Sequence, residues 1–299
     1  MRSKTHNYMA NINLKFVLIC LAFLFLIFLI LRSSYQSPLT TTSPSNNSTD
    51  YEAQSKSSST DCPTIDIPPP TTPTCNKISP SLAEAMVHYA TSNVTPQQTK
   101  KEVSVSLRVL QRKSPCNFLV FGLGLDSLMW TALNHGGRTV FLEEDKSWID
   151  QITRQLPSLE SYHVVYNTKV TEADELMEIG MREHCKDVVD PRQSKCELAL
   201  KGLPNEVYDI DWDLIMVDAP TGYFDGAPGR MTAIYTAGLM ARNREEGDTD
   251  VFVHDVNRVV EDKFSKAFLC EGYLVEQENR IRHFTIPSHR ARSETPFCP

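Results

Sequence analysis

The stretch Cys116–Trp130, CNFLVFGLGLDSLMW, decides the fold. It reads as a buried strand that runs into a glycine turn and then into a helix, an arrangement that commonly holds nucleotide-type cofactors. The turn departs from the dinucleotide fingerprint, because Ser127 stands where a third glycine would bring helix and strand together around a pyrophosphate. This departure disfavours NAD and favours S-adenosylmethionine, which carries a carboxylate and no pyrophosphate.

Short apolar strands alternate with helices along the rest of the chain. The expected strands are NFLVFG, TVFLEE, YHVVYN, WDLIMVDAP and DVFVHDV, and the tail GYLVEQENRIRHFTIPS predicts two more, joined by a turn at Glu278 and Asn279. Continuous apolar strands between helices indicate a parallel sheet that is buried on both faces. We therefore predict an α/β fold: a doubly wound, mostly parallel sheet of the class I S-adenosylmethionine-dependent methyltransferase type, closed by a C-terminal antiparallel hairpin.

Two helices are expected before the first strand. SPSLAEAMVHYATS predicts a helix with a capping box at Ser81 and Glu84, and Thr95 followed by Pro96 predicts the start of the second helix.

The N-terminal segment predicts a membrane anchor. Residues 16–31 contain no polar side chain, and the positive charges before them favour a cytoplasmic N-terminus. A cleaved signal peptide is the alternative, but the residues that follow offer a poor cleavage site. We predict a cytoplasmic tail (1–15), a transmembrane signal anchor (16–31), a flexible lumenal stem rich in Ser, Thr and Pro (32–74) and a folded domain (75–299), in a type II topology typical of Golgi enzymes.

Charge and cysteine usage narrow the classes of partner. The formal net charge of −7 argues against a nucleic-acid partner. Cysteines outside the anchor are odd in number, which leaves one unpaired or bonded between chains, as in a disulfide-linked dimer. Plausible pairs are Cys62 with Cys75, Cys185 with Cys196 and Cys270 with Cys298, and Cys116 is the expected buried thiol.

The carboxyl ends of the first two strands carry candidate cofactor residues, because ligands of doubly wound sheets bind at these ends. Glycines let the backbone approach a ligand closely, and an acidic residue about 20 positions later is placed to accept the ribose hydroxyls. We favour Glu144 for that role, with Glu143 second. The cofactor candidates are Gly122, Gly124, Asp126, Ser127, Glu144 and Glu143.

Two later strands end in polar residues that suit catalysis. Asp218 follows WDLIMV, and His254, Asp255 and Asn257 follow DVFV. The catalytic candidates are Asp218, His254 and Asp255, with Asp218 or His254 as general base. Asp218, Asp255 and Asn257 would also suit a divalent cation, whereas the alternative is that Asp255 and Asn257 only cap the next helix.

A basic group predicts an acidic ligand. Arginine suits carboxylates, so an acidic sugar is a natural ligand, although solvated residues on an edge strand would give the same pattern. The substrate-binding candidates are Arg230, Arg282, His283, His289 and Arg290.

A glycosyltransferase that uses a nucleotide sugar is a rival interpretation. The triplet Asp248–Asp250, DTD, matches the formal metal–nucleotide motif, but it precedes its strand and would lie at the wrong end of the sheet.

Taken together, the motifs resemble those of the plant glucuronoxylan 4-O-methyltransferases, within the irregular-xylem-related polysaccharide methyltransferases. The resemblance covers residues 75–299 and rests on SPCNFLVFGLG, DSLMW, LNHGGRT, LESYHVVY, WDLIMVDAPTGY, APGRM, YTAGL, ARNRE, TDVFVHDVNR and RHFTIPSHRAR.

The resemblance implies methyl transfer from S-adenosylmethionine to O4 of glucuronic acid on xylan at the Golgi membrane, within a possible xylan-synthesis complex and with divalent-cation dependence. Arabinogalactan glucuronate as acceptor and a non-catalytic assembly role are the alternatives. One departure from the family is Leu125, which stands where the family's loop carries a histidine.

Overall fold

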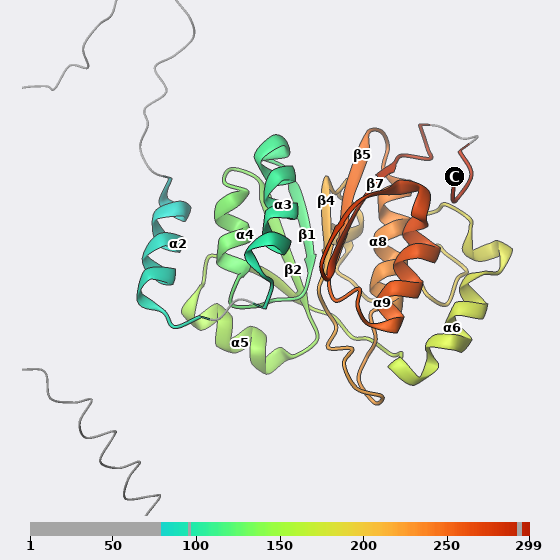
Figure 1. The fold of residues 1–299 in the computed structure, drawn as a ribbon, viewed down its shortest axis with the longest axis horizontal. Helices are drawn as coiled ribbons and strands as arrows, with labels where there is room; N and C mark the ends of the chain where they lie inside the picture. The colour runs from blue at the N-terminus through green and yellow to red at the C-terminus, as the bar shows by residue number, and fades with distance from the viewer. Residues whose placement is uncertain (1–78, 95–96, 292–294) are drawn as a thin grey trace, which may run out of the picture. The chain divides into compact units, whose positions relative to one another are not determined.

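The protein folds around a seven-stranded sheet (Figure 1). The computed structural model describes residues 79–94, 97–291 and 295–299. The predicted tail, anchor, stem and Cys62–Cys75 pair lie outside these residues. Within the described ranges, no helix has the length and apolar character that crossing a bilayer requires.

The sheet has the order β3-β2-β1-β4-β5-β7-β6. All neighbours pair in parallel except β7, which runs antiparallel to β5 and β6, so the predicted doubly wound sheet with a C-terminal hairpin is confirmed. Asn279, with φ of 52°, lies in the turn of that hairpin. The strands are β1 (Asn117–Phe121), β2 (Arg138–Glu143), β3 (Glu160–His163), β4 (Leu214–Val217), β5 (Asp248–Val253), β6 (Leu274–Glu278) and β7 (Ile281–Pro287).

Helices cover both faces of the sheet, and alternate strand residues supply two separate cores (Figure 1). On one face Phe118 and Phe141 pack with α2 (Pro80–Thr91), α3 (Lys100–Lys113), α4 (Ser127–Leu133) and α5 (Lys146–Gln155). On the other, Leu119 and Val140 pack with α6 (Ala173–Gly180), α8 (Met231–Asn243) and α9 (Val259–Phe264). A short helix, α7 (Asn205–Tyr208), precedes β4, and a π-helical turn, Ser265–Cys270, continues α9.

The first two helices start differently from the prediction. Helix α2 begins at Pro80, and the Ser79 hydroxyl accepts from the Leu82 amide, so the predicted box at Ser81 and Glu84 is wrong. Proline favours the first helical position because its missing N–H would be unpaired there. Helix α3 begins at Lys100 rather than after Thr95, because Thr99 and Glu102 form a complete capping box.

Two of the predicted disulfides fall within the described residues, and both are present: Cys185–Cys196 and Cys270–Cys298. Cys116 is a buried free thiol, as predicted, and burial raises its pKa to about 11. The described part of the chain therefore offers no exposed free thiol for a disulfide-linked dimer.

The DTD triplet forms the amino end of β5, where Asp250 stabilises the fold. Its carboxylate accepts from His283 at 2.7 Å and from Thr285 at 2.7 Å, and Lys113 lies 2.6 Å away. Burial alone would raise the pKa of Asp250, but these three partners lower it to about 2. The triplet is thus used inside the fold and offers no metal–nucleotide site.

We expect Asp250→Asn to lower the free energy of unfolding at pH 7 by roughly 3 kcal/mol, because it breaks a buried ion pair. The pKa of Asp250 is depressed on folding, so its contribution is complete above the ordinary value of 3.8 and disappears as the pH falls toward about 2. Urea unfolding at pH 7 and pH 3 measures this: the gap between wild type and variant should narrow at pH 3. Asp248→Asn, an exposed change in the same triplet, is the control. Equal effects of both variants would contradict the assignment.

Candidate active site

A cavity of about 1070 Å³ lies at the carboxyl ends of β1, β2, β4 and β5. This is the position expected for a ligand of a doubly wound sheet. Its walls include every predicted cofactor residue and the three predicted catalytic residues.

The glycine loop forms one wall of the cavity. Gly122 has φ of 126°, a conformation that side chains rarely adopt, and its backbone faces Ala219 after β4. The Ser127 hydroxyl accepts from the Gly124 amide at 2.9 Å and thereby fixes the loop. Asp126 accepts from the Trp130 indole at 3.0 Å, and burial raises the pKa of its carboxyl group. Ser127 is therefore a loop brace, and Asp126 is the acidic group that the loop presents.

Glu143 ends β2 and Glu144 follows it, and the two carboxylates have different partners. Glu143 lies under the glycine loop, where its carboxylate accepts from the Leu123 amide at 3.2 Å and from the Asp145 amide at 3.0 Å. Glu144 reaches across the cavity instead, and its Oε1 accepts from the amide and hydroxyl of Thr221 at 3.0 and 2.7 Å. This geometry reverses the order of preference from the sequence, since only Glu143 lies against the glycines.

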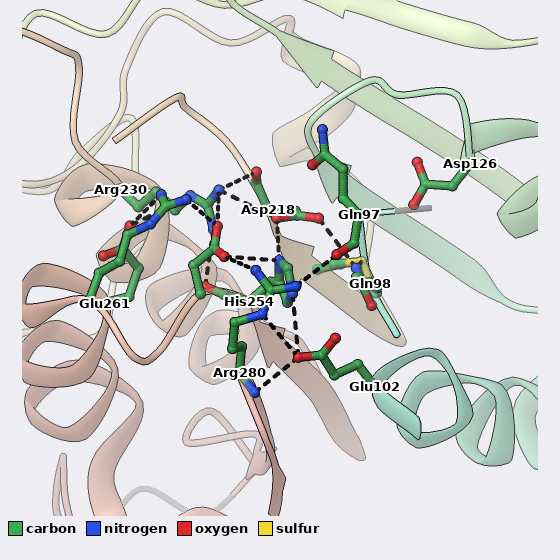
Figure 2. A network of polar contacts seen from close by, with 12 residues as sticks. Gln97, Gln98, Glu102, Asp126, Asp218, Arg230, His254, Glu261 and Arg280 are labelled. Atoms are coloured by element: carbon green, nitrogen blue, oxygen red, sulfur yellow. Dashed lines mark hydrogen bonds and ion pairs between the residues drawn. The ribbon is translucent and has the colours of Figure 1, made fainter. Parts of the chain in front are cut away.

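Asp218 and His254 form a hydrogen-bonded pair in the cavity floor (Figure 2). Nδ1 of His254 lies 2.9 Å from Oδ1 of Asp218, and the Gln98 amide donates to Oδ2 at 3.2 Å. The Asp218 side chain is 17% exposed and that of His254 only 2%, so Asp218 is the member that a ligand can reach. Although burial opposes it, the bond to His254 and the charge of Arg230 hold the pKa of Asp218 below its ordinary value. Asp218 is therefore an ionised carboxylate at neutral pH.

Asp255 is surrounded by three arginines. Arg230, Arg258 and Arg280 approach its carboxylate to 3.0, 2.7 and 3.1 Å. Its φ of 60° is unfavourable for a non-glycine residue, and the ion pairs offset that cost, which is on the order of 1 kcal/mol. Asp255 therefore organises arginines and does not act as a helix cap.

Arg230 is buried and structural, contrary to its predicted role in holding a ligand. Its guanidinium donates to the carbonyl oxygens of Pro220, Asp218 and His254 at 3.0, 2.6 and 3.0 Å. With a 4% exposed side chain it ties together the loops after β4 and β5 (Figure 2).

The C-terminal basic strip, which runs from Arg280 to Arg290, reaches the cavity only through Arg280. Arg282 pairs with Asp262, His283 pairs with Asp250, and the buried His289 donates its amide to the Arg242 carbonyl. Arg290 lies in the segment after β7, away from the cavity. The edge-strand alternative is wrong as well, because β7 lies between β5 and β6 and because Arg282, His283 and His289 are buried. Asn257 is exposed and is not part of the cavity wall.

Several residues of the cavity escaped the sequence analysis. They are Gln98, Trp148 and Arg258, with Glu102 behind them. Trp148 donates from its indole to the Leu123 carbonyl at 2.6 Å and presents a ring beside the glycine loop. A signal was available for Arg258, which ends the motif HDVNR, whereas Gln98 comes from a segment with no motif.

The cavity has an acidic balance. Its walls carry twice as many carboxylates as guanidinium groups: Asp126, Glu143, Glu144, Asp145, Asp218 and Asp255 against Arg230, Arg258 and Arg280. Such a wall favours a ligand with a positive charge, such as a sulfonium, over an anionic nucleotide.

Leu125 contributes to the loop through its backbone. Its carbonyl accepts from the Tyr89 hydroxyl at 2.8 Å, and burial raises the pKa of Tyr89 to about 12, so the phenol remains a donor. The Leu125 side chain is 39% exposed at the cavity edge. Asp218 and His254 already supply a carboxylate and an imidazole in the cavity floor.

We expect Leu125→His to change kcat by less than about threefold, because exposed substitutions away from special contacts shift free energies by about 0.5 kcal/mol. Steady-state kinetics measure this, with Leu82→His, an exposed change on α2, as control. A gain above about tenfold would show that the family's histidine does take part in the reaction.

The chain is similar in sequence to known proteins. Residues 101–284 match the family model described as IRX15/IRX15L/GXM. The chain is 59% identical to glucuronoxylan 4-O-methyltransferase 3 of Arabidopsis thaliana, over 100% of this chain and 98% of that protein. It is 68% identical to glucuronoxylan 4-O-methyltransferase 1 of the same plant, over 75% and 82%, and 51% identical to arabinogalactan O-methyltransferase 2, over 74% and 78%. Among solved structures, an O-methyltransferase from Bacillus cereus in complex with SAH aligns with a TM-score of 0.37 and 14% identity, over 72% of this chain and 92% of that one.

Proposed function

The chain belongs to the IRX15/IRX15L/GXM family, and from that premise we propose that it transfers a methyl group from S-adenosylmethionine to O4 of glucuronic acid side chains of glucuronoxylan. The observation that carries the proposal is the ionised Asp218, held by His254, in a cavity that begins at the glycine loop. An O-methyltransferase needs a cofactor position and a proton acceptor next to each other.

The cofactor half of the cavity would use the glycine loop and Glu143. S-adenosylmethionine supplies a methyl group that is already activated on a sulfonium, so the chain's own task is to align it. Glu143 is placed to accept the ribose hydroxyls, and Gly122 and Gly124 let the backbone come close. Trp148 offers an aromatic face to the base.

Asp218 would receive the proton of the acceptor hydroxyl. Its carboxylate is the exposed member of the pair, and Nδ1 of His254 keeps it oriented from behind. As O4 took the methyl carbon and the bond from that carbon to sulfur broke, the O4 proton would pass to this carboxylate, so full negative charge on the oxygen would not build up. Arg230 keeps Asp218 ionised and fixes the two loops on which the pair stands.

Arg258, together with Arg280 of the C-terminal strip, would bind the uronate carboxylate. Their side chains are 29% and 31% exposed in the cavity, so each keeps guanidinium surface for a ligand. A forked guanidinium matches a carboxylate in geometry and charge.

We expect Arg258→Gln to raise the KM for glucuronoxylan by about 10- to 100-fold, because a hydrogen bond to a charged group is worth about 1.5–3 kcal/mol. The Kd for S-adenosylmethionine should stay within about threefold of wild type. Arg290→Gln, which removes an arginine of the strip, is the matched control. If Arg290→Gln raised KM and Arg258→Gln did not, the strip would be the acceptor site.

Asp218, His254 and Asp255 fit a divalent cation in donor type and spacing, since one donor atom from each lies within 4.8 Å of the others. Two carboxylates and an imidazole suit ions such as Mn²⁺ or Co²⁺. We propose His254 in place of Asn257 as the third ligand. Bound there, the ion would act as a Lewis acid on the acceptor oxygen. The ion would share both carboxylates with Arg230, whose guanidinium lies 3.3 Å from Asp218 and 3.0 Å from Asp255.

The proposed location is the Golgi membrane, through residues 16–31, with the catalytic domain in the lumen and in contact with a xylan-synthesis complex. The apolar run and its positive N-terminal flank support this topology. Protease protection of the domain in sealed microsomes tests it, and digestion without detergent would contradict it.

The central experiment is transfer of labelled methyl to glucuronoxylan oligosaccharides by the full chain, with neutral xylan and arabinogalactan as parallel acceptors and with chelator as a separate arm. We expect label on O4 of glucuronate in glucuronoxylan only. Preferential labelling of arabinogalactan would reassign the acceptor. Cofactor binding without labelling of any acceptor would favour a non-catalytic assembly role.

A further inference from the structure

Two neighbouring aromatic side chains stand exposed beside the cavity. Tyr223 is 71% exposed and Phe224 is 51% exposed, and Tyr223 is also part of the cavity wall. Their ring centroids lie 5.1 Å apart with 70° between the planes. Large aromatic side chains that are exposed to this extent leave much apolar surface in water, which is uncommon away from a binding surface.

The loop that carries these rings is held in place by hydrogen bonds. The Gly222 amide donates to the Pro228 carbonyl at 3.0 Å, and the Ala227 amide donates to the Phe224 carbonyl at 2.9 Å. Gly222 has φ of 63°, which suits a tight turn without a side chain.

The two ends of the loop are tied to the rest of the domain. Glu144 holds Thr221 at the start, and Lys169 forms an isolated bridge with Pro228 at the end. The rings are thus presented by a braced backbone, and a ligand that packs on them costs less ordering entropy than one that binds a flexible loop.

A sugar chain is the occupant that this surface fits. The C–H bonds of a β-linked pyranose project from the faces of the ring, so each face is apolar while the rim carries hydroxyls, and such a face packs on an aromatic ring. The surface is two rings wide and adjoins the cavity through Tyr223, with Arg258 bound to the Thr221 carbonyl at 3.2 Å. A polymer whose side chain enters the cavity must leave its neutral backbone at this edge.

We propose that Tyr223 and Phe224 form a subsite that stacks against backbone xylose units of the acceptor, outside the unit whose glucuronate is methylated. The inference rests on the proposed function and goes beyond it, because it predicts that the chain recognises polymer length. Affinity then comes from units that never approach the methyl group.

The test is the double variant Tyr223→Ala/Phe224→Ala in the full chain, assayed with a short acceptor that bears glucuronate on one or two xylose units and with a long glucuronoxylan oligosaccharide. The expected result is that the KM for the long acceptor rises at least about tenfold and rises more than the KM for the short acceptor. Tyr223→Phe/Phe224→Tyr keeps both rings and should behave as wild type. Met181→Ala removes an exposed apolar side chain outside the cavity wall and is the surface control.

A second measurement separates this inference from the proposed function. Retardation of the protein in gels that contain unsubstituted xylan needs no methyl transfer, and the double variant should lose it while the ring-keeping variant retains it. If wild type methylates glucuronoxylan but the double variant keeps the wild-type KM for both the long and the short acceptor, the subsite is refuted and the function stands. A change of oligomeric state in the double variant, with xylan retardation intact, would also overturn it and would assign the rings to a protein contact. If wild type is retarded through the rings but methylates no glucuronoxylan, the subsite stands and the function fails.

Discussion

Asp218→Asn should lower kcat for methyl transfer by about 10²- to 10⁴-fold and leave the Kd for S-adenosylmethionine nearly unchanged. The substitution keeps size and shape but removes the charge that receives the proton. The Asp218 pKa lies below its ordinary value, so wild type keeps the ionised form at neutral and mildly acidic pH, and only the variant lacks a base there. Single-turnover transfer with saturating cofactor and acceptor measures the chemical step directly.

His254→Gln is the informative partner of this variant. His254 is 2% exposed and orients Asp218, so its loss should cost less, on the order of 10-fold. A loss equal to that of Asp218→Asn would make His254 the base. If Asp218→Asn instead lowered cofactor affinity and thermal stability along with activity, Asp218 would act through Arg230, with which it shares the cavity floor.

Glu143→Ala should weaken S-adenosylmethionine binding by at least about 100-fold, since two hydrogen bonds to a charged acceptor contribute about 1.5–3 kcal/mol each. The same change frees the Leu123 amide from its carboxylate partner, so the glycine loop also loses a support. Calorimetric titration with S-adenosylmethionine and with its demethylated product measures both losses.

Glu144→Ala is the matched control, because it removes the same carboxylate one residue later. Its partner is Thr221, so we expect cofactor affinity to fall by less than about tenfold. The reverse order of effects would restore the preference for Glu144 that the sequence alone suggests.

The sheet could be predicted because its pattern is local. Continuous apolar runs such as Phe118–Phe121 and Leu214–Val217 are bounded by turn residues, and each run is buried in the structure. The helix starts were less predictable: two overlapping cap patterns, at Ser79 and at Ser81, compete before α2, and the proline between them decides in favour of the first.

The candidate site could be predicted only where it follows a strand. Asp218 and His254 come directly after β4 and β5, so topology alone brings them together. The arginines could not be assigned in this way, because a charged side chain reaches in whichever direction its neighbours allow. Arg282 and Arg280 are two residues apart, yet Arg282 is taken by Asp262 while Arg280 reaches Asp255 in the cavity.

The contact between Glu144 and Thr221 joins the end of β2 to the loop that carries Tyr223 and Phe224, so cofactor and acceptor binding would be thermodynamically linked through it. One end of the contact follows the strand that would seat the cofactor, and the other begins the loop that carries Tyr223 and Phe224. If the cofactor tightens that contact, it strengthens acceptor binding by some factor, and the acceptor must then strengthen cofactor binding by the same factor.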